Sequence, residues 1–215
     1  MRLILDLDGT LIDSAGDIHA AVARVLAAEG HAPLPLARVR GFIGDGPEAL
    51  MRRVVAAVDA DSAQLADWHA AFLRHYAAAP AALTRVAEGA APALEGLRAA
   101  GWRLAICTNK PPEATGLVLG ALGLAPLFDA VAAGPVGGRQ KPAPDPLLHA
   151  AARLGGGPAV YVGDSEVDAA AAAAAGLPFG FYTGGYARAP AEPQAFRFDR
   201  FAELPGRLEA LAAPA

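Results

Sequence analysis

Short apolar segments alternate with longer segments rich in alanine and leucine along most of this chain of 215 residues. Continuous apolar runs bounded by turn residues are typical of strands that are buried on both faces, and their alternation with helical segments is typical of parallel sheets. We therefore expect an α/β fold with a parallel sheet and helices on both of its faces. The expected strands are residues 2–7, 103–107, 128–132, 159–162 and 179–182.

About a hundred residues separate the first two expected strands, and this interval is far too long for a single crossover connection. It contains helical patterns at residues 14–28, 47–58 and 62–79, and another helix is expected at 92–100. Ser14 and Asp17 have the spacing of a capping box, and Pro47 stands at the first turn of its helix. The alanine- and proline-rich residues 77–83 are interpreted as the return linker. We therefore expect an inserted, all-helical unit.

The overall charge and composition exclude several classes of protein. A formal net charge of −4 and scattered arginines do not favour nucleic-acid binding. The single cysteine, Cys107, cannot form an intramolecular disulfide, and the five histidines lack zinc-ligand spacing. Residues 1–12 lack the pattern of a signal peptide, so we expect a cytoplasmic protein. The uncharged run at 169–187 is interrupted by glycine and proline, so no membrane span is expected.

Charged and polar residues cluster where the expected strands end. The first strand ends at Asp6 and Asp8, the segment TN follows the second, and GDSEVD follows the fourth. Because the carboxyl ends of parallel strands meet at one crevice, these residues are expected to converge, together with Lys141. Several carboxylates at one point repel each other, and a hard divalent cation with oxygen ligands relieves that repulsion. The pattern therefore favours a Mg²⁺ site.

Each of these segments also has a purely structural interpretation. Asp and Gly commonly close a strand with a turn, Thr108 and Asn109 could cap a helix, and Lys141 could lie on the surface. Asp164 and Asp168 could be a helix cap and part of a solvated face. The aromatic series Trp68, Phe72 and Tyr76 has helical spacing and is interpreted as the core of the insertion rather than as a substrate platform. For Lys110, Ser165 and Glu166, the sequence leaves open whether the residue takes part in the site or only lines its rim.

The order DLDGT, TN, KP and GDSxxD resembles the haloacid dehalogenase superfamily of aspartate-nucleophile phosphatases. Within it, the chain is most similar to the phosphoglycolate phosphatase family, through DLDGTLIDS, IGDGPEALMRR, TNKP, KPAPDPLL and GDSEVDAAAAAAAG. The resemblance covers nearly the whole chain. It implies a Rossmann-like catalytic core formed by residues 1–12 and 85–215, with a helical cap formed by residues 13–84.

The resemblance, together with the chemistry of the side chains, also implies a role for each motif. Asp6 would be the nucleophile that forms an aspartyl-phosphate, and Asp8 the general acid and base. Thr108 and Lys141 would bind phosphoryl oxygens. Asp6, Asp164 and the backbone carbonyl of Asp8 would hold Mg²⁺, with Asp168 acting through water or by positioning Lys141.

The cap would select the substrate, for which 2-phosphoglycolate is expected. The segment from Gly44 to Pro47 opens a helix whose free N–H groups, with Arg52 or Arg53 nearby, could receive an anionic end of the substrate. Asp45 places a negative charge in the same loop, and an ordinary Gly-Pro helix start is the alternative. The alternatives are a phosphatase or mutase for a small phosphosugar and, in a different class, a phospho-accepting signalling module. We expect a small phosphorylated substrate as the partner, and neither nucleic acid nor a membrane. The protein itself is expected to be a monomer or a homodimer. Expected substrate-binding residues are Gly9, Gly44, Gly46, Arg53, Thr108 and Asn109.

Overall fold

A computed structural model describes residues 1–187, 190 and 193–212. Its centre is a six-stranded sheet in the order β5-β4-β1-β6-β7-β8, in which every neighbouring pair is parallel. The expected α/β class and parallel sheet are confirmed. The strands are β1 (Arg2–Leu5), β4 (Arg103–Thr108), β5 (Ala130–Ala133), β6 (Ala159–Gly163), β7 (Phe179–Tyr182) and β8 (Phe196–Phe198).

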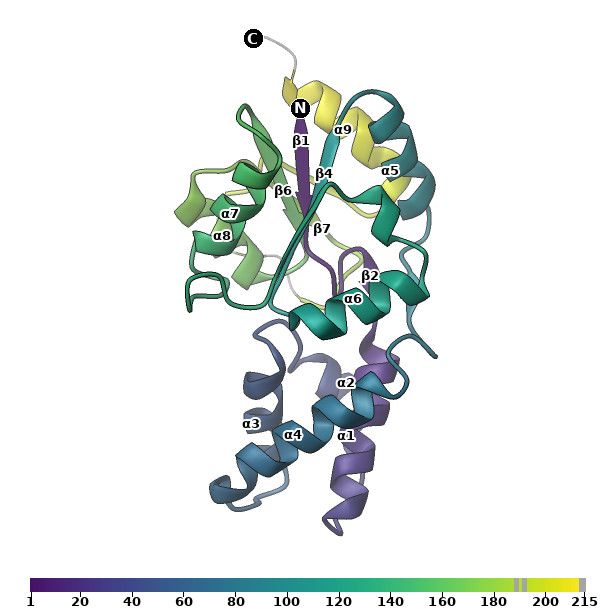
Figure 1. The fold of residues 1–215 in the computed structure, drawn as a ribbon, viewed down its shortest axis with the longest axis vertical. Coiled ribbons are helices and arrows are strands. Elements are labelled where there is room, and N and C mark those ends of the chain that lie inside the picture. The colour runs from purple at the N-terminus through teal and green to yellow at the C-terminus, as the bar shows by residue number, and fades with distance from the viewer. Residues whose placement is uncertain (188–189, 191–192, 213–215) are drawn as a thin grey trace.

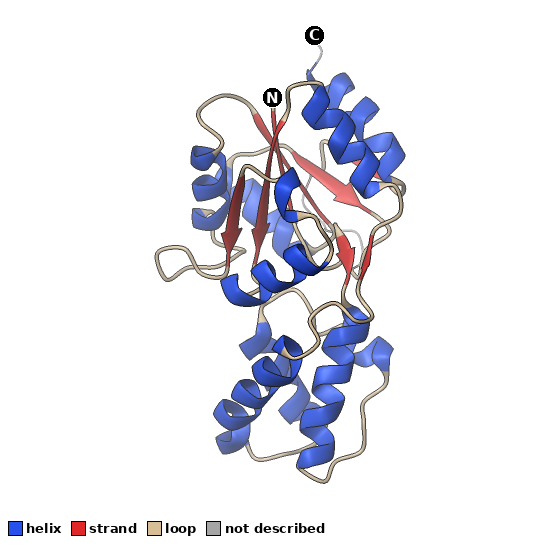
Figure 2. Ribbon diagram, turned by 45° about the vertical axis from the view of Figure 1, so that its right-hand side comes forward, coloured by secondary structure: helices blue, strands red, loops and turns tan. Residues whose placement is uncertain are grey.

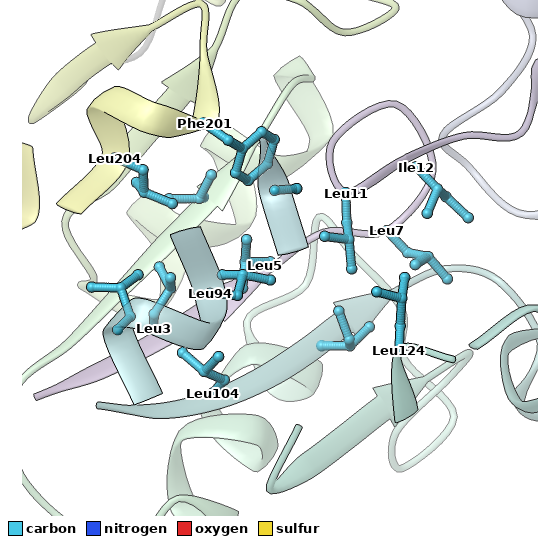
Figure 3. Packing of buried hydrophobic residues seen from close by; sticks show 14 of the residues in the cluster. Leu3, Leu5, Leu7, Leu11, Ile12, Leu94, Leu104, Leu124, Phe201 and Leu204 are labelled. Atoms are coloured by element: carbon cyan, nitrogen blue, oxygen red, sulfur yellow. The ribbon is translucent and has the colours of Figure 1, made fainter. Parts of the chain in front are cut away.

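Helices cover both faces of this sheet because successive strand side chains point to opposite sides. In β1, Leu3 and Leu5 pack into one hydrophobic cluster, shown in Figure 3, and Ile4 packs into the other. The first cluster includes side chains from α5 (Ala90–Ala99), α6 (Pro112–Ala121) and α9 (Leu204–Ala212), and the second includes α7 (Asp145–Arg153) and α8 (Glu166–Ala175). Figure 1 shows α7 and α8 on the opposite side of the sheet from α5 and α9.

The insertion after β1 contains α1 (Ala15–Ala28), α2 (Leu36–Arg40), α3 (Pro47–Ala57), a 3-10 turn η1 (Ser62–Gln64) and α4 (Leu65–Ala77). These helices share a hydrophobic core of their own, which includes Trp68, Phe72 and Tyr76. The structure therefore confirms that this aromatic series belongs to the core of the insertion. Figures 1 and 2 show the insertion as a separate lobe beyond the carboxyl ends of the strands.

A small two-stranded ribbon joins the lobe to the sheet domain. It pairs β2 (Ile12–Asp13) with β3 (Arg85–Val86) in antiparallel register. The two strands lie at the proposed boundaries of the cap, residues 13–84, and that division of the chain remains our proposal. Among the described residues, none of the helices combines the length and apolar character that a bilayer crossing needs.

Two local predictions are wrong. The first strand ends at Leu5 rather than Leu7, so Asp6 and Asp8 lie in the loop that follows it. Ser14 and Asp17 do not form a capping box. The Ser14 hydroxyl donates instead to Asp8, 2.5 Å away. The Asp17 carboxylate accepts bonds from Leu83, at the end of the expected return linker, and from Thr84, which follows it. Tertiary partners for both side chains have replaced the local bonds that their spacing favours.

Candidate active site

Asp6 and Asp8 both line a cavity between the carboxyl edge of the sheet and the helical cap. The backbone N–H of Asp6 donates to the carbonyl of Val162 in β6, at 2.9 Å, so Asp6 stays bonded to the neighbouring strand of the sheet. Asp8 follows in a turn, where it forms an isolated bridge with Ile12. The two carboxylates therefore reach one cavity although the strand that precedes them has already ended.

Lys141 lies between two carboxylates, those of Asp6 and Asp168, and contacts both. Its Nζ donates to Asp6 at 2.8 Å, to Asp168 at 2.6 Å and to the Tyr161 hydroxyl at 2.8 Å. Burial and Asp168 raise the pKa of Asp6 well above its usual value, although Lys141 acts in the opposite direction. Burial alone would lower the pKa of Lys141, but Asp168 and Asp6 raise it further than burial lowers it. Lys141 is therefore a buried cation, and it is not a surface lysine.

Asp168 is fully buried, so it does not belong to the solvated face that the sequence left open for it. With Ser165 it forms the capping box of α8, in which its side chain accepts from the Ser165 backbone N–H at 3.1 Å. Its other carboxylate oxygen accepts from Lys141 and from Tyr161, both at 2.6 Å. The helix start therefore fixes the carboxylate that positions Lys141. Tyr161 was not recognised from the sequence, where it looks like one more apolar residue of a buried strand.

Asp6, Asp164 and Asp168 form an acidic cluster in which one carboxylate oxygen of each lies within 4.8 Å of the others. Burial and Asp168 raise the pKa of Asp164 to about 7. Asp164 accepts hydrogen bonds from the Thr10 hydroxyl at 2.8 Å and from the backbone of Tyr186 at 2.7 Å. Three buried carboxylates with one lysine suit a hard divalent cation with oxygen ligands, because such an ion relieves their mutual repulsion.

Gly9 provides room for this cluster. Its φ of +89° lies in the left-handed region, and a Cβ at this position would come within 2.5 Å of an Asp164 carboxylate oxygen. Gly9 does not line the cavity and lies next to the acidic cluster.

Thr108 and Asn109 lie at the end of β4, and both line the cavity. The Asn109 amide group donates to the carbonyls of Gly44 and Lys141, and its oxygen accepts from the Lys141 backbone, all at 3.0 Å. Asn109 therefore clamps Lys141 and also contacts the cap loop. The interpretation of Thr108 and Asn109 as a helix cap is wrong, because α6 is preceded by Pro111 as its N-cap.

Lys110, left undecided by the sequence, is buried between the core and the cap. Its Nζ lies 3.1 and 3.2 Å from the two carboxylate oxygens of Asp8 and 4.4 Å from the centre of the Tyr76 ring of α4. Burial alone would lower the pKa of Lys110, but Asp8 and Tyr76 raise it, and the net direction is upward. Lys110 directly follows the TN motif in the sequence, and this position was the signal that pointed to a site role.

The cap side of the cavity is apolar. Among the described cap residues that line the cavity, Tyr76 is the one whose side chain carries a polar atom. Its hydroxyl donates to the Pro80 carbonyl at 3.1 Å. Gly44 and Gly46 also line the cavity, as the sequence suggested for the cap loop. The side chains from the described part of the cap that line it are Ile18, Ile43, Pro47, Leu50, Phe72, Leu73 and Tyr76.

Arg53, expected at the substrate, is placed elsewhere. Its guanidinium forms an ion pair with Asp45 and donates to the Phe42 carbonyl at 2.8 Å, and the residue does not line the cavity. Arg52 pairs with Glu48 on the surface of α3, where 64% of its side chain is exposed. The two arginines are therefore occupied within the cap.

Tyr186 follows the end of β7, and no motif in the sequence singles it out. Its hydroxyl donates to Asp13 at 2.7 Å and accepts from the backbone N–H groups of Ser14 at 2.7 Å and Ala15 at 3.0 Å. Its own backbone N–H reaches Asp164. Tyr186 therefore connects the acidic cluster to the start of the first cap helix.

Comparison with known proteins agrees with this geometry. Residues 2–176 match the family model of the haloacid dehalogenase-like hydrolases. The chain is 48% identical to a phosphoglycolate phosphatase from Cereibacter sphaeroides (strain ATCC 17029), and the match covers 98% of this chain and 99% of the relative.

Solved structures share the fold. A predicted phosphoglycolate phosphatase from Haemophilus somnus 129PT superposes with a TM-score of 0.89 at 27% identity, covering 95% of this chain and 96% of the other. CbbY from Rhodobacter sphaeroides in complex with xylulose-(1,5)-bisphosphate has a TM-score of 0.81 at 26% identity, covering 94% and 95%. The chain belongs to the haloacid dehalogenase-like hydrolase family, and it is a phosphatase.

Proposed function

We propose that this protein is a Mg²⁺-dependent phosphomonoester hydrolase that uses Asp6 as its nucleophile, with 2-phosphoglycolate as its substrate. The observation that carries this proposal is the placement of Asp6 and Asp8 in one cavity, with Lys141 2.8 Å from Asp6. A carboxylate nucleophile can divide the hydrolysis of a phosphate ester into two easier displacements.

In the first displacement, a carboxylate oxygen of Asp6 forms a bond to phosphorus as the bond from phosphorus to the ester oxygen breaks. Asp8, in its protonated form, gives its proton to the departing alkoxide. In the second displacement, water attacks the phosphorus of the aspartyl-phosphate, the bond from phosphorus to the Asp6 oxygen breaks, and Asp8 takes a proton from the attacking water. The products are the alcohol and phosphate, and both carboxylates return to their starting forms.

The remaining core residues stabilise charge and hold groups in place. Thr108 and Lys141 would bind phosphoryl oxygens, and Asp168 holds Lys141 through its 2.6 Å contact. Asp6 and Asp164, with the backbone carbonyl of Asp8, would hold Mg²⁺. The ion would neutralise charge on the transferred phosphoryl group.

The proposed substrate is supported by the relatives and by the cap. The relative from Cereibacter sphaeroides is a phosphoglycolate phosphatase and covers nearly the whole chain. The apolar cap side offers few hydrogen-bond partners for the hydroxyl groups of a sugar, and burying unpaired hydroxyl groups is costly. A short leaving group therefore fits this lining better. A small phosphosugar is the second candidate, supported by the similarity to CbbY, which was solved with a sugar bisphosphate.

The test is a turnover screen of small phosphomonoesters with Mg²⁺ present. We expect the highest kcat/KM for 2-phosphoglycolate, with lower values for ethyl phosphate and for hexose phosphates. Rapid acid quenching of turnover with phosphorus-labelled substrate should trap a protein-bound phosphate that hydroxylamine releases, and the Asp6→Asn variant should lack it. A higher kcat/KM for hexose phosphates would contradict the substrate assignment and leave the phosphatase chemistry intact.

A further inference from the structure

The cavity contains very little positive charge for a substrate that carries a second anion. Among the described residues that line it, Lys110 is the one with a cationic side chain. Lys141 lies deeper, between Asp6 and Asp168, and the two arginines of α3 are paired within the cap. An anionic group that enters this cavity therefore finds its cationic side chain in Lys110, and its other possible donors are the backbone N–H groups of the cap loop at Gly44 and Gly46. An anion left unpaired in a buried site is costly.

Both the core and the cap hold the Lys110 ammonium in place. Asp8, from the core, contacts it with both carboxylate oxygens, and the face of Tyr76, from the cap, lies 4.4 Å away. An ammonium has three N–H donors, so it can keep its contact with Asp8 and still donate to another acceptor. The surrounding apolar side chains reduce the screening of its charge by water.

The position of Lys110 relative to Asp8 has a consequence for the leaving group. In the proposed reaction the ester oxygen lies next to Asp8, which gives it a proton. The ammonium lies 3.1 and 3.2 Å from the oxygens of that same carboxylate. In a phosphate ester of a 2-hydroxy acid, a single carbon separates the ester oxygen from the carboxylate. A substrate whose ester oxygen reaches Asp8 therefore brings its carboxylate to Lys110.

From this geometry we infer that Lys110 is the specificity-determining residue that binds the carboxylate of the leaving group. The inference rests on the proposed function and deepens it, because it assigns the enzyme to phosphate esters of short 2-hydroxy acids. The sequence predicted that Arg53 of the cap binds the second anionic group of the substrate, and the inference assigns this role to Lys110 of the core instead. The Arg53 guanidinium instead fixes the cap loop through Asp45 and Phe42.

The experiment measures binding without turnover. In the Asp6→Asn background with Mg²⁺, titration calorimetry gives the Kd of 2-phosphoglycolate and of its carboxamide analogue, which has the same shape and lacks the carboxylate charge. The ratio of the two Kd values defines the preference for the carboxylate. Lys110→Met removes the charge and keeps an unbranched side chain, Lys110→Arg keeps the charge, and Arg53→Met tests the rival cation. The Kd of inorganic phosphate reports whether the phosphoryl site is intact.

We expect Lys110→Met to reduce the preference by about tenfold or more, the loss of one charge-assisted hydrogen bond, while the Kd of inorganic phosphate changes little. Lys110→Arg should keep part of the preference, and Arg53→Met should keep it. An unchanged preference in Lys110→Met, or its loss in Arg53→Met, would overturn the inference. Equal weakening of both esters and of inorganic phosphate in Lys110→Met would also overturn it, because Lys110 would then only support the structure of the site.

The parent enzyme separates this inference from the proposed function. If the parent does not hydrolyse 2-phosphoglycolate in preference to hexose phosphates, the proposed substrate is wrong. If it does, and Lys110→Met still keeps the preference for the carboxylate, the substrate assignment stands and the role of Lys110 is wrong.

Discussion

The two sides of the cavity differ in almost every physical property. The core side, formed by Asp6, Asp8, Thr108, Asn109 and Lys110, is polar, and its side chains are held by bonds to neighbouring strands and loops. The cap side is built from aliphatic and aromatic side chains that belong to the hydrophobic core of the cap itself. Directional polar contacts can fix the geometry of a reaction, whereas apolar surfaces mainly restrict shape and exclude water.

This difference indicates a division of tasks. Changes on the core side should alter the reaction for every substrate, and changes at the cap should alter which substrates enter. Lys110 lies on the border, because it comes from the core and contacts Tyr76 of the cap. Substitutions on either side of the cavity can break this division.

Asp6→Asn should lower kcat by about four orders of magnitude or more for every phosphomonoester, because an amide cannot act as the attacking carboxylate. The measurement is steady-state turnover with 2-phosphoglycolate and ethyl phosphate. Thermal unfolding is the control, and its midpoint should not fall, because burial already disfavours the Asp6 charge. Normal turnover in a sample whose sequence is verified would contradict the role of Asp6.

Removal of divalent cations should also abolish turnover for all substrates. Mg²⁺ should restore activity and Ca²⁺ should not, because Ca²⁺ accepts more ligands at longer distances and can occupy both oxygens of Asp6. The measurement is activity after chelation and titration with each ion. Full activity in excess chelator would remove the metal role proposed for Asp6 and Asp164.

The pH dependence of stability should report the same cluster. In the metal-free chain the pKa of Asp164 rises from 3.8 to about 7, so the folded state binds more protons than the unfolded state between these values. The free energy of unfolding should therefore fall as the pH rises through this interval. Mg²⁺ binds the deprotonated carboxylates, so the stabilisation that it provides should grow over the same interval.

Thermal unfolding at about pH 5 and about pH 7.5, with and without Mg²⁺, measures this effect. The increase in midpoint caused by Mg²⁺ should be larger at the higher pH. An equal increase at both values would show that Asp164 does not exchange a proton for the ion.

Gly9→Ala should weaken Mg²⁺ binding by about 10- to 100-fold, because the new Cβ would displace the Asp164 carboxylate. The measurement is the Mg²⁺ concentration that gives half-maximal activity. Gly30→Ala is the matched control, since Gly30 also has a positive φ but a Cβ there meets nothing within 4 Å. Equal effects of the two substitutions would mean that backbone strain, and not the contact with Asp164, causes the loss.

Gln140→Ala should have the smallest effect. The Gln140 side chain donates to the carbonyl of Asp45 at 3.0 Å and so ties the cap loop to the core. Loss of one such bond should raise KM by a few-fold and leave kcat nearly unchanged. Gln64→Ala, in η1 and away from the cavity, serves as the control. A large fall in kcat would show that the position of the cap loop affects the reaction itself.

Much of the core side could be predicted from the sequence, because its motifs follow buried strands whose carboxyl ends must converge. Asp6, Asp164 and Asp168 form the acidic cluster, and Lys141 reaches two of them. The exact bounds were less predictable. The pattern extends the first strand to Leu7, but β1 ends at Leu5. Asp6 keeps one backbone bond to β6, and the chain then turns to pair Asp8 with Ile12.

Short elements and side-chain partners could not be predicted. The strands β2, β3 and β8 are too short to show a period, and their pairing depends on segments distant in the sequence. Ser14 and Asp17 have the right spacing for a capping box, yet their side chains bind Asp8 and the returning linker. Local spacing favours a bond, and only the folded chain shows whether a better partner is available.

The sequence by itself determined the class of fold, the helical insertion and the convergence of the acidic motifs, because periodicity and the order of strands and helices along the chain can be read without a structure. The tertiary structure decided which cations face the cavity. The sequence favours Arg53 as the cation that binds the substrate and leaves Lys110 undecided, but Asp45 holds Arg53 within the cap and Asp8 holds Lys110 at the cavity. A charge is oriented by its nearest partners in space, and those partners are known only once the chain is folded.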